Sequence, residues 1–143
     1  MKRIMMLVCM VLFLGSLVSV EYMEAADRFV NKKDGTVTDT QTGLMWAAQD
    51  NGSKINWVNA KNYCEGYNGS GKSGWRMPTI TELGELYSSG AYGSVIKKTG
   101  RAVWSSETQG SNAAYFSFTN GSRIWYPQST ANTRRALPVR SDK

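Results

Sequence analysis

The sequence predicts one small α+β domain behind a leader segment, and three observations lead to this fold class. Runs of alternating or β-branched residues gather near both ends of the chain, within residues 28–47 and 103–140. Two segments with helical spacing, residues 57–67 and 80–87, lie between them. This order is typical of helices packed on a small antiparallel sheet, and we expect the first and last strands of that sheet to pair.

The first 26 residues form the predicted leader. A short basic start precedes an apolar run, residues 4–20, which is typical of a signal peptide. Cleavage after Ser19 and cleavage after Ala26 are the alternatives. A retained membrane anchor is the other interpretation, because a run of this length is at the short limit for a spanning helix. Residues 27–143 then form the domain, exported to the periplasm, the medium or the cell surface.

Composition narrows the chemistry. The chain has a formal net charge of +6 and no histidine. A basic exported domain favours anionic partners such as sulfated or acidic polysaccharide, lipopolysaccharide or a phospholipid surface, although the charge could also serve solubility alone. We expect no nucleic acid partner, and a membrane partner only if the leader is retained. The lack of histidine removes Ser-His and Cys-His nucleophiles and imidazole metal sites. We therefore predict no metal, no cofactor and no catalytic residue.

The segment before the first helix has the pattern of a hairpin, residues 35–47, with turn residues at its centre. A polar loop follows, and a helix is expected to begin at Trp57. Spacings of three, four and three residues place one set on a single helical face: Trp57, Ala60, Cys64 and Tyr67. Cys64 is the one cysteine after the leader, and we expect it to be buried. A thiol that pairs between chains is the alternative.

The rest of the chain is organised around residues 74–83. A proline keeps the arm before it extended, and Thr79 followed by Glu82 reads as a capping box for the second helix. The arm carries Trp75 and Arg76. We expect Trp75 to be in the core and Arg76 to pair with Glu82 or a neighbouring glutamate. A ligand platform, with Trp75 on a sugar face and Arg76 on an anion, is the alternative.

The tail predicts further strands. Residues 103–106 are strand-like, and residues 114–126 form a hairpin around Asn120-Gly121. A polar loop then carries two arginines, and residues 136–140 form a short closing strand at an edge of the sheet.

Basic and aromatic side chains of this second half form the candidate binding site. Arginine suits the two oxygens of a sulfate or carboxylate, and aromatic rings can stack on a sugar. We expect loops to gather these residues on one side of the fold, with a scattered solvated surface as the alternative. The candidate residues for an anionic glycan are Lys97, Lys98, Arg101, Arg123, Arg134, Arg135, Tyr115, Trp125 and Tyr126.

Six ordered motifs resemble the Legionella collagen-like protein C-terminal domain family, a bacterial family whose members mostly have no assigned function. They are Gly35–Trp46, Trp57–Ala60 with Tyr63-Cys64, Trp75–Thr79 with Glu82-Leu83, Trp104–Glu107, Phe118 with Asn120-Gly121, and Pro138–Arg140. Their structural residues are Trp46, Trp57, Cys64, Trp75, Arg76, Pro78, Glu82 and Trp104.

The resemblance implies a C-type-lectin-like fold, related in shape to formylglycine-generating enzymes. The eponymous adhesin of the family is associated with sulfated glycans such as glycosaminoglycans. Similar members often carry a second cysteine near the terminal Val-Arg, whereas this chain has Leu137-Pro138-Val139 there. The calcium-lectin carboxylates and the paired cysteines of the formylglycine enzymes are also missing. We expect a non-catalytic binding domain for anionic glycan or envelope polysaccharide, with a protein-recognition module as the alternative and an enzyme third.

Overall fold

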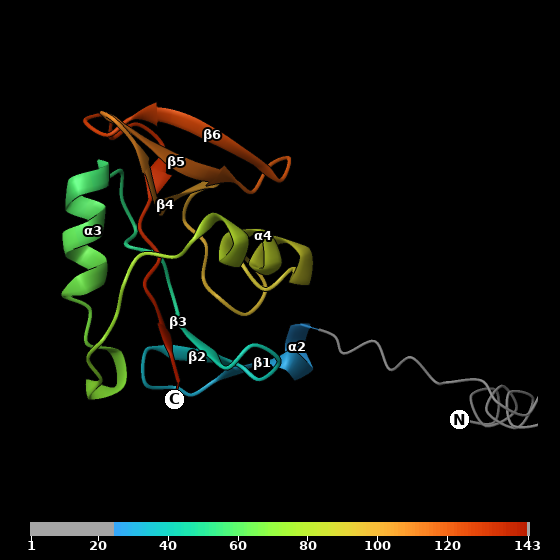
Figure 1. Cartoon of the computed structure of the whole chain (residues 1–143). Coiled ribbons are helices and arrows are strands. Elements are labelled where there is room, and N and C mark those ends of the chain that lie inside the picture. The colour runs from blue at the N-terminus through green and yellow to red at the C-terminus, as the bar shows by residue number, and fades with distance from the viewer. Residues whose placement is uncertain (1–24, 143) are drawn as a thin grey trace, which may run out of the picture.

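Two small sheets at opposite ends of the molecule, with a helix between them, build the α+β fold of residues 25–142, which the computed structural model describes (Figure 1). The fold class agrees with the prediction. The predicted signal peptide, residues 1–26, lies almost entirely outside the described residues. No helix of the described part is long and apolar enough to cross a membrane.

The first sheet contains four antiparallel strands in the order β1-β2-β3-β8. Short helix α2 (Ala25–Arg28) leads into β1 (Phe29–Asn31). The predicted hairpin is confirmed as β2 (Thr36–Asp39) and β3 (Leu44–Ala47), and the closing strand is β8 (Val139–Ser141).

The predicted pairing of the first and last strands is wrong. Strand β1 pairs with one edge of the hairpin, at β2, and β8 pairs with the other edge, at β3. The two strands therefore share a sheet but lie at its opposite edges. Strand β1 is joined to β2 by the short turn at residues 32–35, whereas residues 138–142 bond along the outer side of β3, from Ala47 to Gly43.

Both predicted helices are present with their caps. Helix α3 (Trp57–Glu65) begins after Asn56, whose side chain accepts a 2.9 Å hydrogen bond from the Asn59 N–H. Helix α4 (Ile80–Ser89) has the full capping box: Thr79 Oγ1 accepts from the Glu82 N–H, and Glu82 accepts from the Thr79 N–H. A 3-10 turn, η1 (Gly69–Gly71), follows α3.

The second sheet has the order β6-β5-β4-β7. Its strands are β4 (Ala102–Gln109), β5 (Asn112–Ser117), β6 (Ser122–Pro127) and β7 (Arg134–Arg135). The predicted Asn120-Gly121 turn joins β5 to β6, and Gly121 has the positive φ of +73° that such a turn favours. The predicted single antiparallel sheet is wrong in two respects: there are two sheets, and β7 pairs with β4 in parallel where the sequence predicts a loop.

Two clusters form the core. The larger one joins both sheets through α4 and includes Trp46, Leu83 and Phe116. The smaller one joins α3 to the second sheet and includes Cys64 and Trp104. Cys64 is fully buried, as its helical spacing predicts.

Most tryptophans belong to the core, as predicted. Trp46, Trp75 and Trp104 are buried. Trp57 is half-buried, and its Nε1 donates a 2.8 Å hydrogen bond to the Ser105 carbonyl. These contacts favour the structural interpretation of these rings over the ligand platform.

The central arm joins the two halves of the fold. The backbone of Arg76 exchanges hydrogen bonds of 2.9 and 3.0 Å with Val139, at the start of the last strand. Its guanidinium donates from both terminal nitrogens to Glu82, at 2.9 and 2.7 Å. The predicted pairing of Arg76 with the helix carboxylate is therefore confirmed.

Candidate anion-binding pocket

A pocket of about 410 Å³ lies where β4, β5 and β7 of the second sheet meet. Its wall combines hydroxyl groups, two arginines and one tyrosine, and contains no carboxylate among the described residues. The lining residues are Thr99, Gly100, Arg101, Ala102, Tyr115, Ser117, Thr119, Thr133 and Arg135. Three of the predicted site residues, Arg101, Tyr115 and Arg135, are thus brought together here.

Arg135 is held in place by neutral oxygens. Its Nε donates to Thr99 Oγ1 at 3.0 Å, Nη2 to the Thr99 carbonyl at 3.2 Å, and Nη1 to the Thr133 carbonyl at 3.3 Å. A Cβ on Gly100 would lie 2.8 Å from Arg135 Cγ, so the glycine leaves room for this placement. No described carboxylate forms a salt bridge with Arg135. The side chain is thus oriented without a direct ion pair, and the Asp50 carboxylate is linked to it through the Thr99 hydroxyl.

A buried carboxylate fixes the threonine that orients Arg135. Asp50 is 2% exposed and accepts from the Thr99 N–H at 2.7 Å, from the Thr99 hydroxyl, and from the Tyr92 hydroxyl at 2.6 Å. Burial, together with the hydrogen bond to Asp50, raises the pKa of Tyr92, which keeps this hydroxyl a donor. Asp50 and Thr99 are 49 positions apart, so no sequence pattern joins them.

Arg101 and Tyr115 complete the charged and aromatic part of the wall. Arg101 is exposed, and its carbonyl accepts a 2.7 Å hydrogen bond from the Phe118 N–H, which fixes the backbone at the entrance to β4. Among the described residues no carboxylate forms a salt bridge with Arg101. Tyr115 is half-buried in β5.

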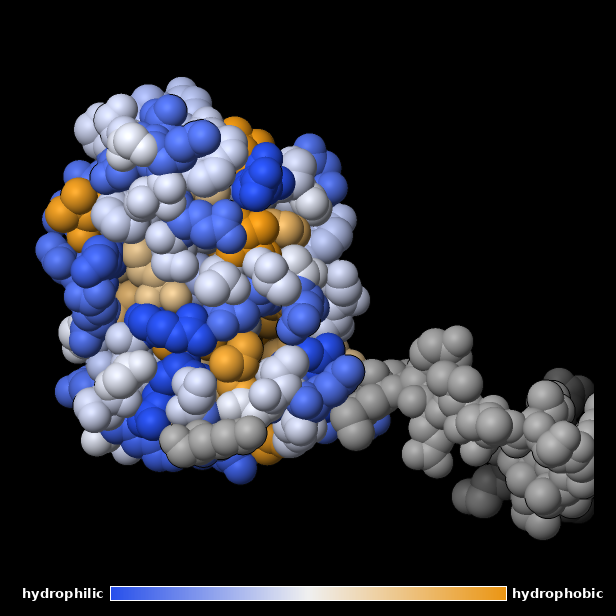
Figure 2. All heavy atoms as spheres, in the orientation of Figure 1, coloured by the Kyte–Doolittle hydropathy of each residue, from blue (hydrophilic) through white to orange (hydrophobic). Residues whose placement is uncertain are grey.

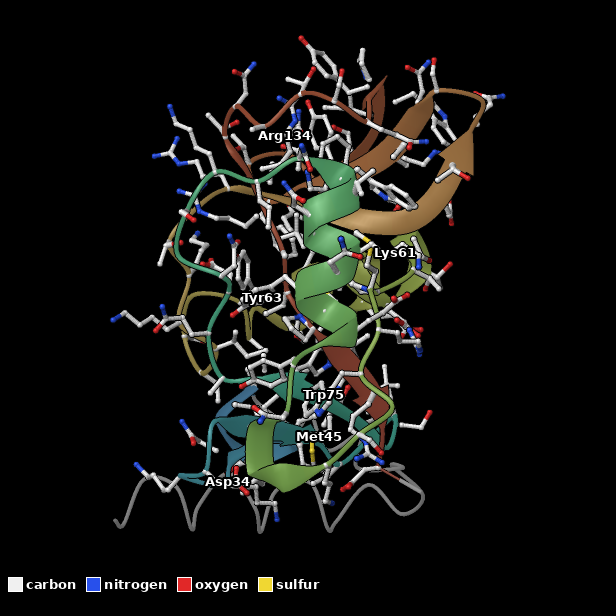
Figure 3. The ribbon with its side chains drawn as sticks, turned by 90° about the vertical axis from the view of Figure 1, so that its left-hand side faces the viewer. Asp34, Met45, Lys61, Tyr63, Trp75 and Arg134 are labelled. Carbon is white, nitrogen blue, oxygen red and sulfur yellow. The ribbon has the colours of Figure 1, made fainter. Side chains whose placement is uncertain are left out.

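Arg134 differs from the sequence-based expectation of an exposed loop arginine. It is only 5% exposed, because strand β7 places its side chain on the face of the sheet that carries Tyr115. Its Cζ lies 4.3 Å from the ring centre of Tyr115, 4.1 Å from that of Tyr126 and 5.8 Å from that of Trp104. Figure 3 places Arg134 beside the start of α3, where the Arg134 carbonyl accepts from the Ile55 N–H at 3.2 Å.

The remaining predicted residues lie elsewhere. Lys97 and Lys98 are exposed on the connection before the pocket and do not line it. Arg123 and Trp125 alternate with Tyr126 along β6, so they lie on the opposite face of the sheet. There Arg123 lies 5.5 Å from the Trp125 ring centre and 3.8 Å from Glu107. The predicted binding residues are therefore only partly gathered on one side of the fold.

Two other recesses have different chemistry. The larger, about 710 Å³, includes Arg28, whose charge is already paired with Asp39, and also Glu85. The smaller, about 280 Å³, includes Arg76, which is paired with Glu82. Within residues 25–142 no cluster of histidine, cysteine, aspartate and glutamate side chains could hold a metal ion. The pocket of Arg101 and Arg135 differs from these two because neither of its arginines forms a salt bridge with a described carboxylate.

These observations define the chain as a small α+β domain with a basic pocket at one edge of its second sheet. The family model of the Lcl C-terminal domain matches residues 35–140, so the chain belongs to the Legionella collagen-like protein C-terminal domain family. The match extends from the first hairpin to the last strand and includes the pocket. No curated protein matches the chain in a sequence comparison.

Proposed function

We propose that this chain is an exported, non-catalytic binding domain for an anionic glycan or cell-envelope polysaccharide. The observation that carries the proposal is a pair of arginines without salt bridges to described carboxylates, Arg101 and Arg135, in one pocket lined by hydroxyl groups. Arginine binds sulfate or carboxylate through two parallel charge-assisted hydrogen bonds, and neither of these side chains forms a salt bridge with a described carboxylate.

Different groups of the pocket can bind the anion and the sugar of the ligand. Arg135 is oriented by Thr99 and Thr133, so little side-chain entropy is lost when an anion binds. A charge-assisted hydrogen bond of this kind contributes about 1.5–3 kcal/mol. Hydroxyl groups of the wall, such as that of Ser117, can bond to sugar hydroxyls, and Tyr115 offers an aromatic edge.

The fold supports a scaffold role for this protein. We infer a C-type-lectin-like fold, as the family resemblance implies, in which connections between strands carry the ligand site. Glu82 and Glu85 on α4 are two carboxylates that could act as an acid/base pair, but Glu82 accepts hydrogen bonds from Arg76 and from the Thr79 N–H, which favours binding over catalysis. Its carboxylate is thus committed to the fold, and it does not face Glu85 across a substrate.

A protein-recognition module is the second candidate. One observation favours it: Val58 and Tyr63 on α3 are 50% and 38% exposed. Figure 2 shows that the face turned to the viewer is mostly hydrophilic, with small, separated hydrophobic areas. Such scattered areas are ordinary on a monomer, whereas a docking surface needs a larger contiguous patch.

Retention on a heparin column across a salt gradient tests the proposal. The protein expressed from the complete sequence would be compared with Arg101→Gln, Arg135→Gln and a control, Arg140→Gln. Arg140 lies on β8 in the other sheet, and its Nε donates to the Ser141 carbonyl. Each variant removes one positive charge, so net charge alone predicts equal losses. Earlier elution of Arg101→Gln and Arg135→Gln than of Arg140→Gln supports the pocket, and equal elution of the three variants rejects it.

A further inference from the structure

Arg134 is a buried cation that the described part of the protein leaves without a hydrogen-bonding partner. Its Nε is fully buried and has no hydrogen-bond partner among residues 25–142. No described carboxylate forms a salt bridge with it either. Buried polar groups in folded proteins are nearly always hydrogen-bonded, so this exception requires an explanation.

The aromatic neighbours of Arg134 offset only part of the cost of burying its charge. The ring centres of Tyr115 and Tyr126 lie 4.3 and 4.1 Å from its Cζ and 6.4 Å from each other, so the two rings cover adjacent sides of the cation and attract it. A ring face does not replace the oxygen acceptors that the guanidinium N–H groups had in water, and the attraction is smaller than the cost of removing a charge from water. An oxyanion at the two terminal nitrogens would compensate the charge and accept hydrogen bonds from their N–H groups.

We propose that Arg134 is an anchor of the ligand site, pairing with one oxyanion of the bound polymer while Tyr126 supports the sugar that carries it. This proposal rests on the proposed function and specifies its ligand. Tyr126 is 37% exposed, which makes it the most exposed of the three rings around Arg134. Tyr115 contacts Arg134 and also lines the pocket, so the two sites are contiguous.

The ligand class follows from this arrangement. Arg101 and Arg135 take one anionic group in the pocket, and Arg134 takes a second one beside Tyr126. A sugar with a single charge would satisfy only one of these sites. The structure therefore points to a polymer with oxyanions, sulfate or carboxylate, on neighbouring sugar units.

A purely structural role is the competing explanation. In that case Arg134 only fixes β7 against the aromatic residues, and ordered water satisfies its nitrogens. A simple Arg134 variant cannot separate the two, because it could fail to fold. The test therefore needs a signal from the unmodified Arg134 side chain and a variant at an exposed position.

The signal is the Nε–H resonance of Arg134 in a ¹⁵N NMR spectrum, which burial protects from rapid exchange. A heparin-derived tetrasaccharide would be titrated into the protein expressed from the complete sequence. A fully desulfated tetrasaccharide, which keeps its carboxylates, separates sulfate from carboxylate recognition. Tyr126→Ala removes the exposed ring, Tyr126→Phe keeps it, and Arg140→Gln controls for net charge.

We expect the Arg134 resonance to shift and to saturate with the same Kd as the resonances of the pocket. We also expect Tyr126→Ala to weaken binding about threefold to tenfold, with Tyr126→Phe near the unmodified protein. An unchanged Arg134 resonance, with binding that still depends on Arg101 and Arg135, would overturn the anchor role and leave the proposed function intact. No binding of either tetrasaccharide would overturn both.

Discussion

Replacing Asp39 with asparagine should lower the free energy of unfolding by about 3 kcal/mol, because the change breaks a buried ion pair from one side. Asp39 is 2% exposed, and Arg28 donates to it from Nε and from Nη2, both at 2.7 Å. The carboxylate also accepts from Thr42 Oγ1 at 2.7 Å. An amide keeps one acceptor for the turn but leaves the Arg28 charge unpaired. For a domain of this size the loss corresponds to a fall in Tm of about 10 °C.

The effect should depend on pH in a defined direction. Burial tends to raise the pKa of Asp39, but the hydrogen bonds from Arg28, Thr42 and the Gln41 N–H, with the Arg28 charge, outweigh it and lower this pKa. A lowered pKa in the folded state means that the stabilisation is complete above about pH 4, the ordinary aspartate value. It is lost as the pH falls through the folded-state value.

Urea unfolding followed by tryptophan fluorescence at pH 7 and at pH 3 measures this difference. We expect the gap in free energy of unfolding between the unmodified protein and Asp39→Asn to be smaller at pH 3. The double variant Arg28→Met/Asp39→Asn should be less destabilised than the sum of the single variants. An equal gap at both pH values, or additive losses, would refute the ion-pair account.

Three further predictions follow from the same geometry. Glu82→Ala should lower the free energy of unfolding, measured with urea, by about 1–2 kcal/mol. Loss of the capping box costs about 1 kcal/mol, and loss of the bond to Arg76 adds little because the Arg76 side chain is 41% exposed. An unchanged urea midpoint would contradict this prediction. Burial raises the pKa of the Cys64 thiol to about 12, so a thiol-specific reagent at pH 8 should label Cys64 only in denaturant. Rapid labelling of the native protein would contradict the burial of this thiol. Thr99→Val should weaken heparin binding about fivefold, because Arg135 and Asp50 both lose their hydrogen bond to the Thr99 hydroxyl. Thr99→Ser keeps a hydroxyl and should bind heparin like the unmodified protein. Equal affinities of the two variants would show that Thr99 does not orient Arg135.

Local features of the fold could be predicted from the sequence. The capping box depends on two residues three positions apart, Thr79 and Glu82, and the 114–126 hairpin depends on one dipeptide, Asn120-Gly121. The burial of Cys64 follows from helical spacing alone. In each case the atoms that interact come from residues close together in the chain.

Features that depend on distant partners could not be predicted. Strand β7 is two residues long and has no alternation, so only its packing beside β4 makes it a strand and buries Arg134. The division of the strands into two sheets depends on which neighbouring strand each short strand pairs with. Asp50 reaches the pocket through Thr99, 49 positions away, and no residue pattern around Asp50 indicates this role. The sequence therefore indicates which residue types belong to the candidate site, but it does not predict how these residues are arranged.

The central claim is that Arg101 and Arg135, two arginines in one pocket without salt bridges to described carboxylates, bind an oxyanion of a glycan. Calorimetric titration of a heparin-derived tetrasaccharide into the unmodified protein and into Arg101→Gln/Arg135→Gln, with Arg140→Gln as control, tests it most directly. The account predicts binding that weakens with salt, is retained in the control and is lost in the double variant. Equal affinity of the double variant and the control would contradict it.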